Sequence, residues 1–286
     1  MSVAARRERA AELAALWRGR AERLPVIGTV ITEWYRIEVV DRSMAIGAQG
    51  LLAVLPMLVV LAAFLPHDIA VTLYQQVSDT VGLDRQQSAP LGGLMTEGEG
   101  TVNAGFIGVV IALLSATSFS RALQRMYART FDLDWTSRRG KLRASSVWLF
   151  VWLTFLAFEA WFGSQSDTLP LATAVVANLF LHLGFWWWTL HSLLLGDVCW
   201  SDLLPTATIT AVAVLVLARG SSLVMPVYAK SIIAQYGSFG LILAMATWMV
   251  AMAGALVLSA SVGALITQTP TWRTVAVRAG LPGATR

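Results

Sequence analysis

The sequence predicts an all-α membrane protein, with six transmembrane helices, both termini cytoplasmic and an additional N-terminal amphipathic helix. Composition is the first reason: the chain is 56% hydrophobic and only 13% charged, whereas soluble domains carry about 25% charged residues. The second reason is patterning, because the apolar residues fall in long blocks without a polar face. A bilayer core needs about 20 apolar residues for each helical span, and these blocks meet that need.

The segment before the first span, residues 1–43, is basic and is expected to lie in the cytoplasm. Within residues 3–24, apolar side chains recur at helical spacing among arginines and glutamates: Leu13, Leu16, Trp17 and Leu24. This pattern predicts an amphipathic helix, which either lies on the membrane surface or forms an ordinary solvated tail. The same charges exclude the apolar region of a signal peptide.

Six apolar segments make up the predicted transmembrane domain, residues 44–268. They cover approximately residues 44–65, 104–119, 144–162, 171–190, 203–218 and 241–266. The outer segment 219–240 is interrupted by Pro226, Gly237 and Gly240. Proline removes a helical hydrogen bond, so this segment is expected to form a short separate outer helix, followed by a tight glycine turn into the last span.

The distribution of lysine and arginine predicts the orientation. Six spans place both termini, residues 121–143 and the tail of residues 269–286 on one side of the membrane. That side holds all of the 21 basic residues except Arg85, Arg219 and Lys230. Cytoplasmic loops of membrane proteins carry the excess of basic residues. Both termini, including the C-terminal tail, are therefore expected in the cytoplasm.

Three arginines follow the second span at helical spacing: Arg121, Arg125 and Arg129. They form one stripe on a helix, and apolar residues such as Leu123 and Met126 occupy other faces. The stripe either contacts anionic lipid head groups where the helix leaves the bilayer or binds a dedicated ligand. A nucleic-acid reader would need basic and stacking groups converging on an exposed groove. Head-group contact is therefore favoured, and no nucleic-acid partner is expected.

Polar side chains inside the spans are candidates for a transport site: Gln49, Glu159, Asn178 and His182. Ionisable residues in a span are costly and mark function by default. With the third and fourth spans joined by a turn centred near residues 166–167, Glu159 and His182 differ in depth by about 12 Å, so no direct contact is expected. Alternatively, Glu159 reaches the interface, and Asn178 and His182 join helices through hydrogen bonds.

No catalytic, metal or cofactor site is expected, and the chain is not expected to be an enzyme. Asp132 and Asp134 form an Asp-x-Asp pair, but metal-dependent phosphodiester cleavage needs a larger carboxylate cluster, so local salt pairing at a helix end is favoured. The three histidines are too dispersed to bind one ion. The sequence also lacks a Gly-x-Ser-x-Gly nucleophile elbow and a phosphate-binding P-loop.

Three stretches, taken in order, carry a resemblance to a known family. They are "DRSMAIGAQGLLAVLPMLVVLAAFL" at the first span, "RALQRMYARTF" after the second and "YGSFGLILAMATWMVAMAGAL" at the last. Together they resemble the YihY/virulence factor BrkB family of bacterial inner-membrane proteins over roughly residues 30–268. Relatives often carry an aromatic pair where residues 48–50 read Ala-Gln-Gly, and an acid late in the last span, where residues 256–264 contain none.

The resemblance implies a multi-pass location in the bacterial inner membrane and contact with membrane lipids. Members have carried an old ribonuclease label, and some are proposed to move lipids or other solutes. The resemblance and the polar groups within the spans together favour a transporter, flippase or exporter of a lipid or amphipathic solute. The alternative is a non-transporting membrane scaffold that organises partner proteins through its basic cytoplasmic surface.

Overall fold

The computed structural model describes residues 38–64, 102–133, 141–166 and 170–279, with residues 34, 75 and 281. All regular secondary structure in these ranges is α-helical. The helices are α3 (Val39–Phe64), α6 (Val102–Thr130), α7 (Lys141–Ser166), α8 (Leu171–Leu193), α9 (Trp200–Tyr236), α10 (Ser238–Thr267) and α11 (Pro270–Arg278). The predicted N-terminal amphipathic helix and nearly all of the segment between the first two predicted spans (residues 65–101, except residue 75) lie outside the described residues.

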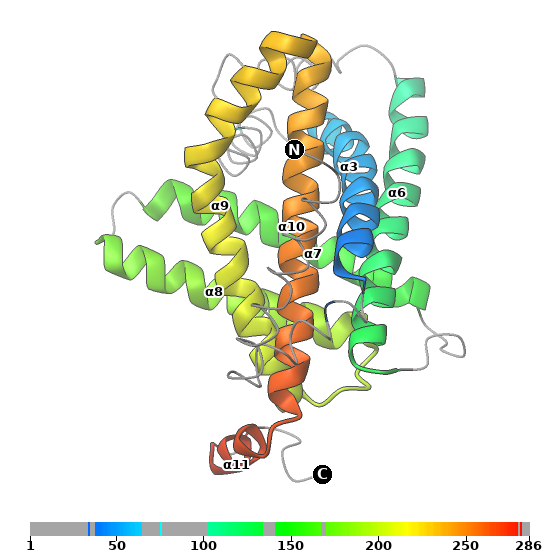
Figure 1. Cartoon of the computed structure of the whole chain (residues 1–286). Helices are drawn as coiled ribbons and strands as arrows, with labels where there is room; N and C mark the ends of the chain where they lie inside the picture. Colours follow the sequence, from blue (N-terminus) through cyan, green and yellow to red (C-terminus); the bar gives the residue numbers. More distant parts are fainter. Residues whose placement is uncertain are drawn as a thin grey trace, which may run out of the picture.

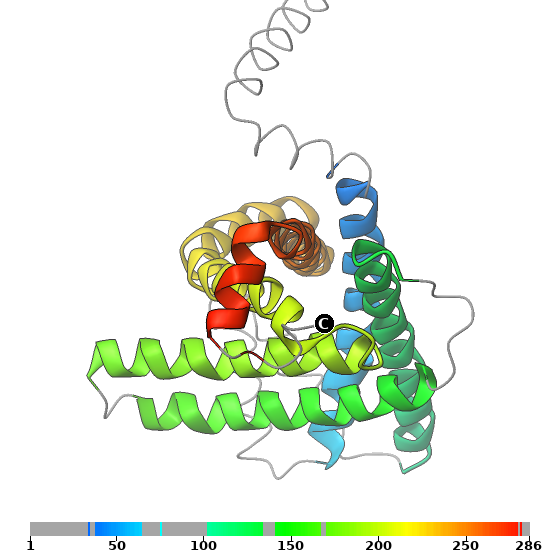
Figure 2. The same ribbon diagram turned by 90° about the horizontal axis from the view of Figure 1, so that it is seen from below.

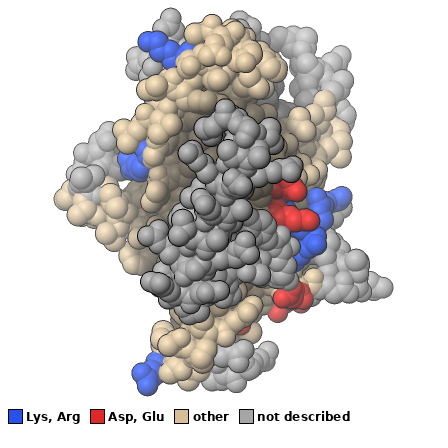
Figure 3. Space-filling view, in the orientation of Figure 1, with Lys and Arg blue, Asp and Glu red and all other residues tan. Residues whose placement is uncertain are grey.

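Helices α3 to α10 each overlap one of the six predicted apolar segments. Within the described residues, three helices are long and apolar enough to cross a membrane: Ala172–Leu193, Trp200–Tyr236 and Phe239–Thr267. On the face seen in Figure 3, most of the described surface carries no charge. An all-α chain with helices of membrane-spanning length is thus confirmed, whereas six spans and the side on which each terminus lies stay predictions.

The helices run in two different directions. Helices α9 and α10 form a long antiparallel hairpin, with α3 and α6 beside it, as Figure 1 shows. Helices α7 and α8 form a second hairpin that crosses the first at a steep angle, which is clearest from below in Figure 2. The two hairpins are joined where α8 packs against α9. The six helices therefore do not form a bundle of parallel spans.

The length of α9 corrects one prediction. The sequence predicted that Pro226 separates a short outer helix from the fifth span, but α9 is one helix of 37 residues that contains both Pro205 and Pro226. The part around Pro226 has one buried face, which packs against α10 and consists of Ser221, Met225 and Ala229. Burial of this face outweighs the cost of proline in a helix, about 3 kcal/mol.

Close glycine contacts fix the α9–α10 hairpin. The predicted glycine turn is confirmed, because Gly237 joins the helices with a φ of 60°, a conformation that favours glycine. A Cβ atom on Gly240 would lie 2.6 Å from the main-chain oxygen of Ile232. Near the other end, a Cβ atom on Gly263 would collide with Thr206. The two helices are therefore in backbone contact at both ends of the hairpin.

The largest apolar core lies where the two hairpins meet α6. It contains Tyr127 and Ala128 from α6, Trp148 from α7, Leu190 from α8 and Val257 from α10. A second, smaller core fills the space between the C-terminal half of α9 and the start of α10. The first core thus supports the inner end of the α7–α8 hairpin, while the hairpin turn extends away from it (Figure 1).

Candidate functional site

A carboxylate–imidazole pair lies between α7 and α8. Oε1 of Glu159 is 3.3 Å from Nε2 of His182. His182 is only 5% exposed, and the Glu159 side chain is 22% exposed. Because an ionisable group inside an apolar helix is costly without a partner, this contact explains how both groups are accommodated in the hairpin.

The contact shows that the prediction of separate side chains was wrong. Helix α7 continues to Ser166 and α8 begins at Leu171, so the centre of the turn lies later than residues 166–167. The 3.3 Å hydrogen bond from Trp148 Nε1 to Thr189 Oγ1 agrees with this, because the two residues are equally far along the chain from the later centre. Glu159 and His182 then differ in depth by only about one helical turn, about 5.4 Å, which a glutamate side chain can bridge.

An aromatic ring packs against the imidazole. The ring of Phe155 meets that of His182 edge to face at 5.3 Å between centroids, and it stacks on Phe185 at 3.9 Å. Phe155 lies one helical turn before Glu159, so both side chains share a face of α7. Sequence reasoning missed Phe155, although this spacing was the signal that could have found it.

Asn178 contacts His182 through its main-chain carbonyl. Its carbonyl oxygen is 3.1 Å from Nδ1 of His182, whereas its side-chain oxygen is buried and has no hydrogen-bond partner among the described residues. Gln49 lies on α3, which packs mainly against α6 and α10, so the structure does not bring it to the pair. A polar cavity shared by Gln49, Asn178 and His182 stays a prediction.

The arginines of α6 form an exposed stripe. Arg121, Arg125 and Arg129 are exposed, while the residues between them are buried. Burial lowers the pKa of Arg42 on α3, the charge of Arg129 lowers it further, and Glu38 raises it. Positive charge from α3 and α6 is therefore concentrated here, as anionic head groups would require, and contact with head groups stays a prediction.

A second face of α6 is polar but buried, and sequence reasoning missed it. Ser120, Gln124 and Tyr127 are fully buried at i, i+4 and i+7 among the arginines. Burial raises the pKa of the Tyr127 phenol. The regular spacing of uncharged polar residues was the available signal. This face adds hydrogen-bonding groups to the main core without adding charge.

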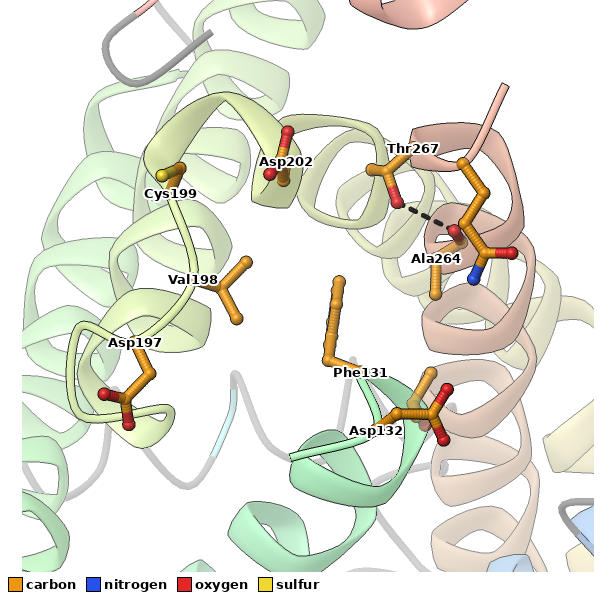
Figure 4. Close-up of a pocket in the computed structure, with 10 residues that line it drawn as sticks. Phe131, Asp132, Asp197, Val198, Cys199, Asp202, Ala264 and Thr267 are labelled. Carbon is orange, nitrogen blue, oxygen red and sulfur yellow. Dashed lines mark hydrogen bonds between the residues drawn. The ribbon is translucent and has the colours of Figure 1, made fainter. Parts of the chain in front are cut away.

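A cavity of about 300 Å³ lies where α6 and α10 end and α9 begins. Phe131 and Val198 point toward its centre, with Asp132, Asp197 and Asp202 around it (Figure 4). The remaining lining residues are Thr130, Cys199, Ala264, Thr267 and Gln268. Within the described ranges, no group of three His, Cys, Asp or Glu side chains could hold a metal ion. The cavity therefore gives no basis for metal-dependent cleavage.

The Glu159–His182 pair is thus the clearest polar site inside the helical hairpins. Chemically, it can bind a proton or a polar group of a solute in otherwise apolar surroundings. No family model, curated protein or solved structure matches the chain.

Proposed function

We propose that this chain is a multi-pass protein of the bacterial cytoplasmic membrane that moves a lipid or another amphipathic solute across the bilayer. The observation that carries the proposal is the Glu159–His182 pair, 3.3 Å apart between α7 and α8. Polar pairs within membrane helices mark substrate and ion pathways. The resemblance to the YihY/virulence factor BrkB family supports the same interpretation and a location in the inner membrane. The distribution of basic residues supports both termini in the cytoplasm.

The crosswise arrangement of the two hairpins supports transport rather than a purely structural role. The α7–α8 hairpin meets the rest of the chain at its inner end and extends away at its turn (Figure 2). A hairpin held at one end can move relative to the α9–α10 hairpin with less disruption than a helix packed along its whole length. The polar pair lies within the hairpin that has this freedom.

Lipid movement in vesicles tests the proposal. The purified full-length chain is placed in phosphatidylethanolamine–phosphatidylglycerol vesicles that contain a fluorescent phosphatidylethanolamine, and dithionite quenching measures how fast inner-leaflet probe reaches the outside. Wild type is expected to move the probe. His182→Ala is expected to slow it by about tenfold, which corresponds to about 1.4 kcal/mol of lost transition-state stabilisation.

Thr154→Ala is the matched control in the same hairpin. Thr154 is exposed and its hydroxyl donates only to the carbonyl of Phe150 on its own helix, at 3.0 Å, so this variant should move lipid like wild type. All rates are compared at equal amounts of protein in the vesicles. Equal rates for wild type and empty vesicles would reject lipid transport, and the scaffold interpretation would then be the better one.

A further inference from the structure

The hydrogen bonds of His182 determine where its protons lie. Nδ1 of His182 is 3.1 Å from the main-chain oxygen of Asn178. A carbonyl oxygen only accepts hydrogen bonds, so Nδ1 carries a hydrogen in this contact. The other ring nitrogen, Nε2, is the atom that faces Glu159. Whether Nε2 carries a hydrogen therefore determines whether Glu159 faces a hydrogen-bond donor or a lone pair.

The contact with Glu159 requires one more proton. If Glu159 were ionised and His182 neutral, a carboxylate oxygen would face the lone pair of Nε2 at 3.3 Å, and both atoms could only accept. One proton between them removes this conflict, either as imidazolium with carboxylate or as neutral imidazole with carboxylic acid. The two groups then titrate as a unit, and the closed arrangement holds one shared proton.

Among the described residues, no other charged group replaces that proton. The hairpin itself carries Arg143 on α7 and His191 on α8. Titratable side chains on the helices packed against it are Arg121, Arg125, Tyr127 and Arg129 of α6 and Asp202, Arg219, Tyr228, Lys230 and Tyr236 of α9. Within the described part of the chain, none of these forms an ion pair or hydrogen bond with Glu159 or His182. The imidazole otherwise contacts the Phe155 ring. Among the groups that the structure describes, a shared proton is therefore what removes the conflict between the two acceptors.

We propose that Glu159 and His182 form a proton-binding site, and that the proton is the coupling ion for solute movement; this rests on the transport function proposed above. A proton from water enters through Glu159, the more exposed member, and completes the contact with Nε2. When the hairpin opens to water on the other side, the proton passes to water and leaves a hydrated carboxylate and a neutral imidazole. One proton is bound and one released in each cycle.

The first test measures lipid movement with and without a pH gradient. The same vesicles and fluorescent phosphatidylethanolamine are used, with the membrane potential clamped by potassium and valinomycin. The rate with the gradient, divided by the rate without it, is expected to rise by up to about tenfold for each pH unit of gradient. The reason is that one pH unit is a tenfold ratio of proton activity. The ratio should fall to one in Glu159→Gln and His182→Gln, and Thr154→Ala should keep the wild-type ratio.

The second test needs no substrate. Infrared difference spectroscopy of the full chain in vesicles follows the carboxyl band of Glu159 and the ring bands of His182 as pH changes. Because the other Asp and Glu side chains also titrate, these bands are taken as the difference between the spectra of wild type and of Glu159→Gln. In wild type, the carboxyl band or the ring bands should titrate in this difference, and the midpoint should change in His182→Gln. A difference that does not change with pH in either set of bands would overturn the proton site. His182→Gln keeps a polar partner for Glu159, so it tests the site if Glu159→Gln folds poorly.

The two tests separate the possible failures. Lipid movement with a rate ratio of one in wild type would overturn proton coupling and leave the transport function standing. No lipid movement under any gradient would reject the transport function and with it the coupling. In that case the infrared titration decides alone whether the pair binds and releases a proton.

Discussion

Gly263 has no room for a side chain, because Thr206 lies directly against it. A Cβ atom at this position would collide with both the hydroxyl and the backbone of Thr206, and Thr206 is fully buried. Backbone cannot rotate away as a flexible side chain can. Close approach of this kind is typical of small residues between membrane helices. At Gly220, by contrast, nothing lies within 4 Å of an added Cβ atom.

Gly263→Ala should therefore destabilise the folded chain, and Gly220→Ala should not. Overpacking costs about 1–3 kcal/mol, whereas alanine in place of glycine within a helix contributes up to about 1 kcal/mol of stability. Thermal unfolding in one detergent, followed by helical circular dichroism, gives the two midpoints. A midpoint for Gly263→Ala equal to that of Gly220→Ala would contradict the close contact.

Glu159 and His182 show how far single residues can be interpreted from sequence. Each was predictable as a candidate, because ionisable groups within apolar blocks are rare. Their contact was not predictable, because helix ends carry an uncertainty of one or two residues. If the centre of the turn is misplaced by one residue, the predicted depth of the facing side chains changes by about 1.5 Å on each of the two helices. That shift was enough to separate the pair in the prediction.

At the scale of the element, one ring makes two of the contacts that join α7 to α8. Phe155 contacts His182 and stacks on Phe185, so it joins α7 to α8 next to the pair. Phe155→Ala should lower the free energy of unfolding by about 1–3 kcal/mol, less than for a fully buried ring, because Phe155 is partly buried. Phe150 on the same helix is 72% exposed, so Phe150→Ala should have a much smaller effect. Equal losses in chemical denaturation would show that the ring does not hold the hairpin.

Helix α9 shows why element boundaries were only partly predictable. Proline and glycine are local signals, and Gly237 was interpreted correctly because its backbone conformation is a local property. Pro226 was interpreted wrongly because its cost is local but its compensation comes from α10. Met225 and Ala229 bury their side chains against a helix that begins after the turn. Local propensity is a weak guide where tertiary packing decides.

At the scale of the whole molecule, α9 is longer than a bilayer core. Its 37 residues span about 55 Å at 1.5 Å for each residue, against about 30 Å of hydrocarbon. The turn at Gly237 is therefore expected to stand outside the membrane on the outer side. Helix α11 follows α10 at the opposite end of the molecule (Figure 1), on the side predicted to be cytoplasmic.

Single cysteines test this orientation, since Cys199 is the one cysteine of the chain. In a Cys199→Ser background, Gln235→Cys at the end of α9 and Thr274→Cys in α11 replace exposed residues. A membrane-impermeant maleimide should label Gln235→Cys in intact spheroplasts and Thr274→Cys only after permeabilisation. The reverse pattern would place both termini outside the cytoplasm. The background without added cysteines should remain unlabelled.

The directions of the helices were beyond prediction from sequence. Apolar blocks indicate how long a helix is and how apolar its surroundings are. They carry no information on whether two hairpins run parallel or cross, since that depends on which side chains interlock between elements. The side chains that join the hairpins, such as Trp186 and Leu190 on α8, were interpretable only as apolar or interfacial.

The glycine contacts of the α9–α10 hairpin have a mechanical consequence. Backbone touches backbone near Gly240 and again near Gly263, so neither helix can slide or twist against the other without a collision. The two helices therefore form one rigid unit. In the proposed transport, movement is expected instead in the α7–α8 hairpin, which is packed into the core near Trp148 and contains the Glu159–His182 pair.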